Sequence, residues 1–278
     1  MSRFFDEARD TTSVTHGCAT FDLPIAYYRD DCFQLLFSAD ADAVRALLPS
    51  DELYPVTQIG GRAIVGIAGY NYLDTSIGSY GEVAVCAFVA HGKRPLPLVP
   101  ALLESSYAGF GFLVLHLPVT HPIARDAGRG QWGYTKFVAD MAFENTPEHH
   151  SCRLSEKGDH ILTLTVAKGG IFASDGRPIT TYSVKDGDLI RTVIPQTGSY
   201  RLRLRCKPSS LELGNHPVAQ SIRDLDLSPE PILQRYYVER SAILPAGVVV
   251  ERGVRPLEGY RGSHDEAAHT VSYTAGAH

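Results

Sequence analysis

Two stretches, EVAVCAFVA at residues 82–90 and FGFLVLHLPV at residues 110–119, decide the fold of this chain. Apolar residues occupy nearly every position of both stretches, which indicates strands that are buried on both faces. Other strand patterns follow, with glycine, proline, asparagine and aspartate between them. These patterns are DCFQLLF (31–37), ILTLTVA (161–167), RLRLRC (201–206) and LPAGVVVERG (244–253).

Helical signals are few. SADADAVRALLPS (38–50) has the pattern of a helix with one apolar face. In THPIARDAGRG (120–130), Thr120 can cap a helix, Pro122 suits its first turn and Gly128 suits its exit. Many strands with few short helices predict an α+β fold that is mainly β, with a barrel-like or sandwich-like sheet.

Composition and spacing predict one globular domain over residues 1–278. The chain is 44% apolar and 21% charged, and it contains no repeat, no low-complexity tract and no clear linker. Residues 1–23 are expected to form an irregular N-terminal arm. The small, polar residues 258–278 are expected to form a loosely held tail.

Charge and hydropathy limit the partners of the chain. The formal net charge of −5 gives no general attraction to nucleic acid. No window holds 18 uninterrupted apolar residues, and Met1–Asp10 lacks an apolar leader, so we expect no membrane partner and a cytoplasmic location. The five cysteines form no C-x-x-C pair, and the 11 histidines form no metal-binding pattern, so no metal site is predicted.

One segment carries a chemical signal: GRGQWGYTKF at residues 128–137. It places Lys136 among aromatic residues and immediately before an apolar run, and it holds the only tryptophan of the chain. A lysine in such surroundings is a candidate amine nucleophile. The alternative is a lysine that packs its stem and extends its charge to the surface.

This segment resembles the lysine motif of the acetoacetate decarboxylases. The positions that match are Gly128, Arg129, Trp132, Gly133, Tyr134 and Lys136. The resemblance extends over roughly residues 25–145, through Tyr28-Arg29-Asp30, the stretch from Asp74 to Glu82, and His121-Pro122. It implies a cone-like antiparallel β-barrel or sheet with a few short helices, and a homo-oligomer.

The resemblance also implies roles for individual residues. Lys136 would be the nucleophile that condenses with a substrate ketone, Glu82 an active-site carboxylate, and Arg29 the partner of the substrate's acidic end. The residues expected in the substrate pocket are Tyr134, Trp132 and Tyr27. Phe137 stands where the family has a second lysine, and alternation along a strand would point Phe137 away from Lys136.

The chemistry explains why these residue types are needed. Loss of CO2 from a β-keto acid leaves an electron pair, and a protonated imine accepts that pair far better than a ketone does. Only a neutral amine can form the imine, and both burial and a nearby cation favour the neutral form. Glu82 would move protons during imine formation. No organic cofactor or metal is required, because the imine itself accepts the electrons.

Three functions remain open at this point. The first is a Schiff-base lyase for a small oxo acid, with decarboxylation of a β-keto acid as the default reaction. The second is an aldolase-dehydratase that acts on oxo acids through the same lysine. The third is a barrel that binds a small hydrophobic carbonyl compound without turnover.

Overall fold

The computed structural model describes residues 3–204, 208–257, 259–263 and 271–275. The chain is mainly β, as predicted, and its strands form one large sheet, one smaller sheet and one hairpin. The helices of the described residues are all short. They are α1 (Ala41–Leu47), α2 (Val99–Leu103), α3 (Pro122–Trp132), α4 (Pro217–Arg223) and two 3-10 helices, η1 (Arg3–Ala8) and η2 (Glu104–Ser106).

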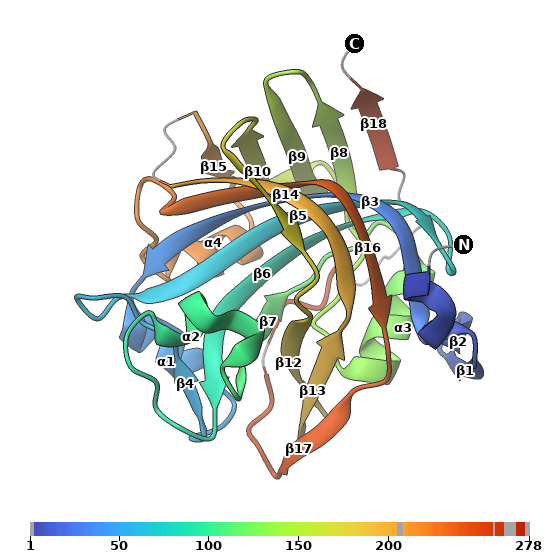
Figure 1. The fold of residues 1–278 in the computed structure, drawn as a ribbon, viewed down its shortest axis with the longest axis horizontal. Coiled ribbons are helices and arrows are strands. Elements are labelled where there is room, and N and C mark those ends of the chain that lie inside the picture. The colour runs from blue at the N-terminus through green and yellow to red at the C-terminus, as the bar shows by residue number, and fades with distance from the viewer. Residues whose placement is uncertain (1–2, 205–207, 258, 264–270, 276–278) are drawn as a thin grey trace.

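The large sheet has 11 strands. They are β3 (Ile25–Ala39), β4 (Leu53–Pro55), β5 (Ala63–Thr75), β6 (Tyr80–His91), β7 (Phe110–His116), β11 (Ile171–Asp175), β12 (Ile179–Lys185), β13 (Asp188–Ile194), β14 (Gln196–Leu204), β16 (Leu233–Leu244) and β17 (Val248–Arg252). Their order is β11-β14-β16-β3-β5-β6-β7-β12-β13-β17, with β4 paired to β6. Neighbours run antiparallel, as predicted, except β7 and β12, which are parallel, so the sheet is mixed. The sheet curls, and β13 also contacts β16 (Figure 1).

The smaller sheet has five strands and covers one face of the large sheet. They are β8 (Asp140–Asn145), β9 (His149–Glu156), β10 (Asp159–Ala167), β15 (Ser210–Leu213) and β18 (Val271–Ala275), in the order β15-β10-β9-β8-β18. Part of the predicted loose tail is therefore paired, because the backbone of β18 runs parallel to β8. The rest of that tail lies largely outside the described residues.

The alternation of side chains along β3, β5 and β6 gives the large sheet two different faces. Phe33, Ile67 and Val85 point into the core shared with the smaller sheet, where Phe33 meets Phe143 edge-on at 6.3 Å between ring centroids. The residues between them point to the opposite, concave face, on the side where α2 lies (Figure 1). The prediction that residues 82–90 are buried on both sides is confirmed.

The helix predicted within residues 38–50 is present as α1, and the Asp40 carboxylate caps it. For α3, two details of the prediction are wrong. His121 caps the helix, because the Thr120 hydroxyl instead accepts a hydrogen bond from the Gly81 N–H at 2.9 Å. The helix also continues through Gly128 and ends at Gly133, whose positive φ of 71° turns the chain away.

The N-terminal segment is more ordered than the predicted arm. After η1, β1 (Thr12–His16) and β2 (Ala19–Leu23) form a hairpin that packs against α3. The side chain of Phe21 is buried and stacks on Trp132 with 6.3 Å between ring centroids, which explains why this segment is held. In the described part of the chain, none of the helices is long and apolar enough to cross a membrane.

Candidate active site

Lys136 lies in a segment without regular secondary structure that follows α3, and its N–H donates to the carbonyl of Tyr134 at 2.8 Å. Gly133 ends the helix, and Tyr134 and Lys136 then point into the concave face of the large sheet. Phe137 points the other way and is fully buried in the core between the two sheets, as alternation predicted. The guanidinium of Arg129, on α3, donates to the backbone carbonyl of Lys136 at 2.6 Å and so fixes the start of this segment.

The helix also shapes the space around the lysine. A Cβ atom at Gly128 would lie 2.5 Å from both Cδ and Cε of Lys136. Only glycine therefore lets the lysine side chain pass this close to the helix. This contact explains the glycine at the head of the segment 128–137.

A buried pair of charges forms the centre of the site. Lys136 Nζ lies 2.7 Å from Glu82 Oε2, and the two side chains are only 6% and 9% exposed. The other oxygen of Glu82 accepts a hydrogen bond from the Tyr72 hydroxyl at 3.1 Å. Burial raises the pKa of Tyr72 and of Tyr80 well above the usual tyrosine value, so both phenols remain neutral. A carboxylate beside an amine can exchange a proton with it.

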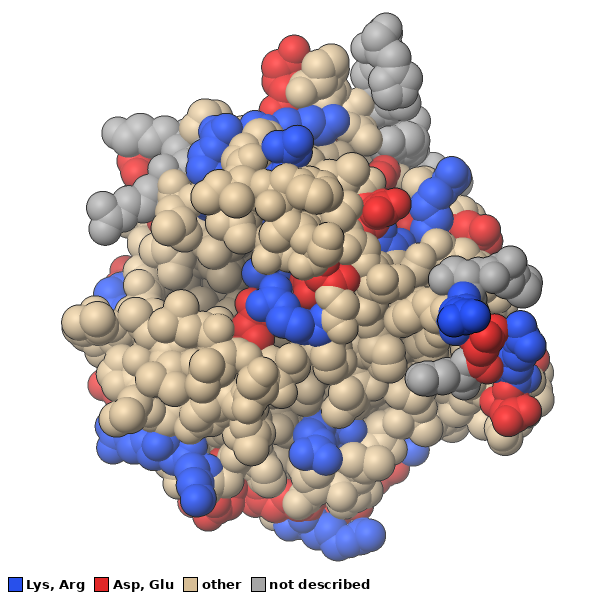
Figure 2. All heavy atoms as spheres, viewed as in Figure 1, with Lys and Arg blue, Asp and Glu red and all other residues tan. Residues whose placement is uncertain are grey.

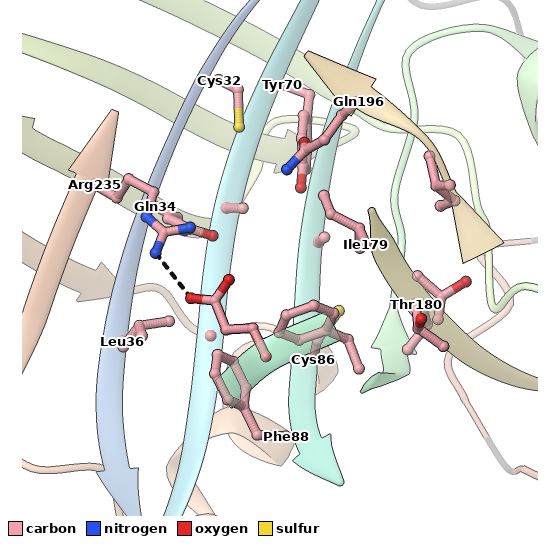
Figure 3. Close-up of a pocket in the computed structure, with 18 of the residues that line it drawn as sticks. Cys32, Gln34, Leu36, Tyr70, Cys86, Phe88, Ile179, Thr180, Gln196 and Arg235 are labelled. Carbon is pink, nitrogen blue, oxygen red and sulfur yellow. Dashed lines mark hydrogen bonds and ion pairs between the residues drawn. The ribbon is translucent and has the colours of Figure 1, made fainter. Parts of the chain in front are cut away.

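The pair opens into a pocket of about 360 Å³ on the concave face. This volume is within the range of small-molecule sites. Its walls come from β3, β5, β6, β7, β12 and β16, with α2 across one side. Figure 3 shows Cys32, Gln34 and Leu36 in succession along β3, with Cys86 and Phe88 along β6. The pocket is therefore an elongated space and not a small chamber around the lysine.

The structure does not bring Arg29 to this site. Arg29 is exposed and does not line the pocket. The register between β3 and β5 shifts between Tyr27 and Arg29 and again between Arg29 and Asp30, and this bulge points Tyr28 and Arg29 outward. The role predicted for Arg29 therefore has no support in its position.

A different arginine, Arg240 on β16, lines the pocket. Its side chain is 4% exposed and donates to Asp30 at 2.5 Å and to Gln196 at 2.9 Å. Burial alone would lower the pKa of Arg240. The neighbouring Asp30 carboxylate instead holds that pKa well above its usual value. The guanidinium also lies 5.4 Å from the ring centroid of Tyr70, which pairs with Glu82 across β5 and β6. Arg240 could not be predicted as a site residue, because a single arginine in YYVERSAIL (236–244) carries no local signal.

The predicted pocket aromatics divide into two groups. Tyr27 and Tyr134 line the pocket, and the Tyr134 hydroxyl lies 2.7 Å from that of Thr181. Trp132 does not line it. Its indole is buried between Phe21 and Tyr134 and donates to the carbonyl of Pro245 at 2.9 Å, so it supports the site from behind.

Charged side chains lie at the mouth of the pocket. Arg177 and Arg235 both pair with Glu104, at 2.8 and 3.4 Å, beside the end of α2. The dashed line in Figure 3 marks the contact of Arg235. This face of the molecule is otherwise mostly uncharged (Figure 2). Among the described residues, no group of three or more histidine, cysteine, aspartate or glutamate side chains could hold a metal ion.

The family model for acetoacetate decarboxylase (ADC) matches residues 12–254 of the chain. The chain belongs to the acetoacetate decarboxylase family. This membership confirms the resemblance seen in residues 25–145 and extends it over most of the chain. A comparison with curated proteins found no match.

Solved structures show that this acetoacetate decarboxylase family member shares its fold with other proteins. The acetoacetate decarboxylase of Legionella pneumophila subsp. pneumophila has a TM-score of 0.62 at 16% identity, over 82% of this chain and 88% of that one. A second acetoacetate decarboxylase has a TM-score of 0.58 at 18% identity, over 82% and 90%. The enduracididine biosynthesis enzyme MppR has a TM-score of 0.56 at 12% identity, over 86% and 91%. MppR is described in complex with the condensation product of pyruvate and imidazole 4-carboxaldehyde.

Proposed function

We propose that this family member is a Schiff-base-forming lyase that decarboxylates a β-keto acid. The observation that carries the proposal is the buried Lys136 amine at 2.7 Å from the Glu82 carboxylate, at the wall of an elongated pocket. A surface lysine that extends its charge into water would have neither the burial nor the fixed partner. Family membership supports the lyase class.

The reaction begins with a proton transfer within this pair. Glu82 takes a proton from the Lys136 ammonium, and the neutral amine attacks the ketone carbon of the substrate. The carbonyl oxygen leaves as water, and a protonated imine remains on Nζ. The bond to the carboxylate carbon then breaks, CO2 leaves, and the electron pair moves into the imine to give an enamine. Protonation of the enamine carbon and hydrolysis of the imine release the ketone product and restore the lysine.

We assign to Arg240 the role that the family resemblance implied for Arg29, which is to pair with the acidic end of the substrate. Its guanidinium is buried in the same pocket and lies over Tyr70, next to the strand that carries Glu82. A fixed positive charge there attracts the substrate carboxylate. The ion pair with Asp30 holds the guanidinium in place.

An aldolase-dehydratase that uses Lys136 is the second candidate. Two observations support this second candidate. The pocket extends well beyond the lysine and has room for a second carbonyl compound. MppR, which is described with a condensation product, has a similar fold. The same imine can lose a proton instead of CO2, and the resulting enamine can attack an aldehyde.

Reductive trapping tests the shared step. The protein is incubated with β-keto acids and with pyruvate, borohydride is added, and the adduct is located by mass spectrometry. We expect a stable adduct on Lys136 and none in Lys136→Arg. Lys185→Arg, at a partly exposed lysine, is the matched control and should behave like the parent.

Absence of any adduct with all these oxo acids would favour the third function, a barrel that binds a hydrophobic carbonyl compound without turnover. Where adducts form, release of CO2 identifies the decarboxylase and a new carbon–carbon bond identifies the aldolase. The homo-oligomer and the cytoplasmic location remain predictions, which light scattering and cell fractionation would test.

A further inference from the structure

We propose that the oxo acid bound by Lys136 carries a long apolar tail, a chain of about ten carbons or more, and that this tail extends along β6 from Glu82 toward Phe88. The inference rests on the proposed function, since it names the substrate class of that same site. It is drawn from the order of residues along the pocket wall.

The register of the central strands arranges the pocket residues in rows. The first row contains Glu82 and its partner Tyr70. The second row contains Ala84 opposite Ala68, and the third contains Cys86 opposite Gly66. On β5 and β6 the pocket wall therefore changes from polar to small, uncharged side chains within two rows of the charged pair, while Gln34 on β3 and Arg235 on β16 continue the second row. These small side chains leave a channel where larger ones would close it.

The far end of the channel is apolar. Phe88 on β6 pairs with Phe112 on β7, and their rings meet edge-on with 4.7 Å between centroids. Leu36 and Ile64 complete this end from β3 and β5. Figure 3 shows Leu36 and Phe88 beside each other at this part of the pocket. Nothing in this row could bind a carboxylate.

The segment around α2 covers the same end with apolar side chains. Leu98 and Ala101 pack against the cluster that contains Phe88, and Leu102 lines the pocket although it is 75% exposed. The Glu104 carboxylate then joins this cover to Arg177 and Arg235 across the mouth. An apolar wall and an apolar cover together fit a hydrocarbon chain.

The length of the channel sets the length of the tail. Six residues separate Glu82 from Phe88, and a strand rises about 3.3 Å per residue, so the rows extend over about 20 Å. An extended chain advances roughly 1.2 Å for each bond. A tail of about ten carbons therefore extends about 12 Å, close to the third row, and about 16 carbons would fill the channel as far as Phe88, whereas a four-carbon acid ends before the second row. Arg240 is on β16, to one side of the channel that follows β6. A substrate carboxylate bound beside Arg240 therefore leaves the channel open for the tail.

The experiment uses methyl ketones, which are the stable products that decarboxylation of 3-oxo acids would give. The full chain is incubated with increasing concentrations of acetone, 2-heptanone or 2-undecanone. Borohydride is then added to trap the adduct at each concentration. Burying each methylene strengthens binding by up to about fourfold. We expect the ketone concentration that gives half-maximal adduct on Lys136 to fall at least about a hundredfold from acetone to 2-undecanone. Equal concentrations for the three ketones would overturn the inference and leave the proposed function standing.

Variants test where the tail lies. Cys86→Phe should block the channel at the third row and abolish the preference for 2-undecanone, while acetone still traps. Leu102→Asp, at an exposed position, should weaken 2-undecanone binding at least tenfold even if Cys86→Phe fails to fold. Leu103→Phe, on the same helix but outside the pocket wall, is the matched control. Unchanged preference in both channel variants would contradict the proposed path.

A second measurement separates this inference from the proposed function. In Lys136→Arg, which cannot form an imine, 2-undecanone should still displace the fluorescent apolar probe N-phenyl-1-naphthylamine, and acetone should not. Displacement without any adduct in the parent protein would contradict the proposed function and support the apolar channel. Adducts in the parent together with no displacement in the variant would contradict the channel.

Discussion

The amine of Lys136 and the carboxylate of Glu82 depend on each other for their burial. Removing two charges from water is unfavourable, and only a short contact with further hydrogen bonds offsets that free energy. The 2.7 Å contact and the Tyr72 hydroxyl supply these interactions. Removing one partner leaves a buried charge alone, which destabilises proteins by about 3–5 kcal/mol. A substitution at either residue must therefore be tested by measuring both the reaction rate and the stability of the variant.

Glu82→Gln keeps the shape of the side chain and removes its ability to accept the ammonium proton. We expect kcat to fall by about a hundredfold or more with a small change in KM, because general acid–base groups contribute roughly 10²–10⁴ in rate. Steady-state kinetics and a thermal unfolding curve measure both effects. Glu144→Gln, at an exposed carboxylate on β8, is the control. A Glu82→Gln enzyme with full kcat would remove Glu82 from the mechanism.

His150 makes the stability of the protein depend on pH. Its ring lies between Phe33 and Tyr236, with centroids 5.4 and 5.2 Å away. Burial, assisted by the charge of Lys168, lowers the pKa of His150 from 6.5 to about 4. Between these values the unfolded chain binds a proton that the folded chain does not, so the free energy of unfolding decreases as the pH falls. Above about pH 6.5 the ring is neutral in both states and contributes no pH dependence.

We therefore predict that His150→Phe unfolds with a weaker pH dependence than the parent. The drop in unfolding free energy between about pH 7 and pH 4 should shrink by about 3 kcal/mol. Urea unfolding at a series of pH values measures this slope, and comparison of slopes cancels any offset at neutral pH. Burial also lowers the pKa of His116 to about 4, so some pH dependence should remain in the variant. Parallel curves for parent and variant would contradict the assignment to His150.

Among the elements, α3 determines where the catalytic lysine lies. Gly128→Ala would place a methyl group against Cδ and Cε of Lys136 at 2.5 Å, so the lysine must move away from Glu82. We expect adduct formation to slow at least tenfold. Alanine is better than glycine inside a helix by about 1 kcal/mol, so the helix itself should not be weakened. Borohydride trapping and a melting curve record the two effects separately.

Gly130→Ala is the matched change on the same helix. Its added methyl group would meet the side chain of His16 in the β1–β2 hairpin and not Lys136. It should loosen the hairpin and leave trapping on Lys136 near the parent rate. Equal trapping in parent and Gly128→Ala would show that the close contact does not position the lysine.

Strands could be predicted where a pattern of apolar residues repeats over many positions. The direction of a side chain could not be predicted where it depends on a single inserted residue. The strands at residues 82–90 and 161–167 are predicted because apolar runs and alternation extend over many positions. The position of Arg29 could not be predicted, because a bulge of one residue reverses which face a side chain occupies. Lys136 and Glu82 were predicted through the family resemblance, whereas their side-chain contact joins two segments that lie 54 residues apart in the sequence.

For the whole molecule, the central strands connect the pocket to the core between the sheets. Along β3, Cys32, Gln34 and Leu36 line the pocket, while Phe33 and Leu35 between them pack against the smaller sheet. Each strand thus contributes to both packed layers at once. Loss of contact with the smaller sheet would therefore expose the back of the strands that shape the pocket.

This shared use of strands predicts that the chain unfolds as one cooperative unit, in line with the single domain expected over residues 1–278. Trp132 is the only tryptophan, and it is buried on the pocket side, away from the smaller sheet. Its fluorescence therefore reports the pocket side, while circular dichroism reports all strands together. Because two-state unfolding makes different probes coincide, we expect the same midpoint from both signals in urea. If the tryptophan signal changes at a clearly different urea concentration, the two sheets unfold separately and the single-domain prediction is wrong.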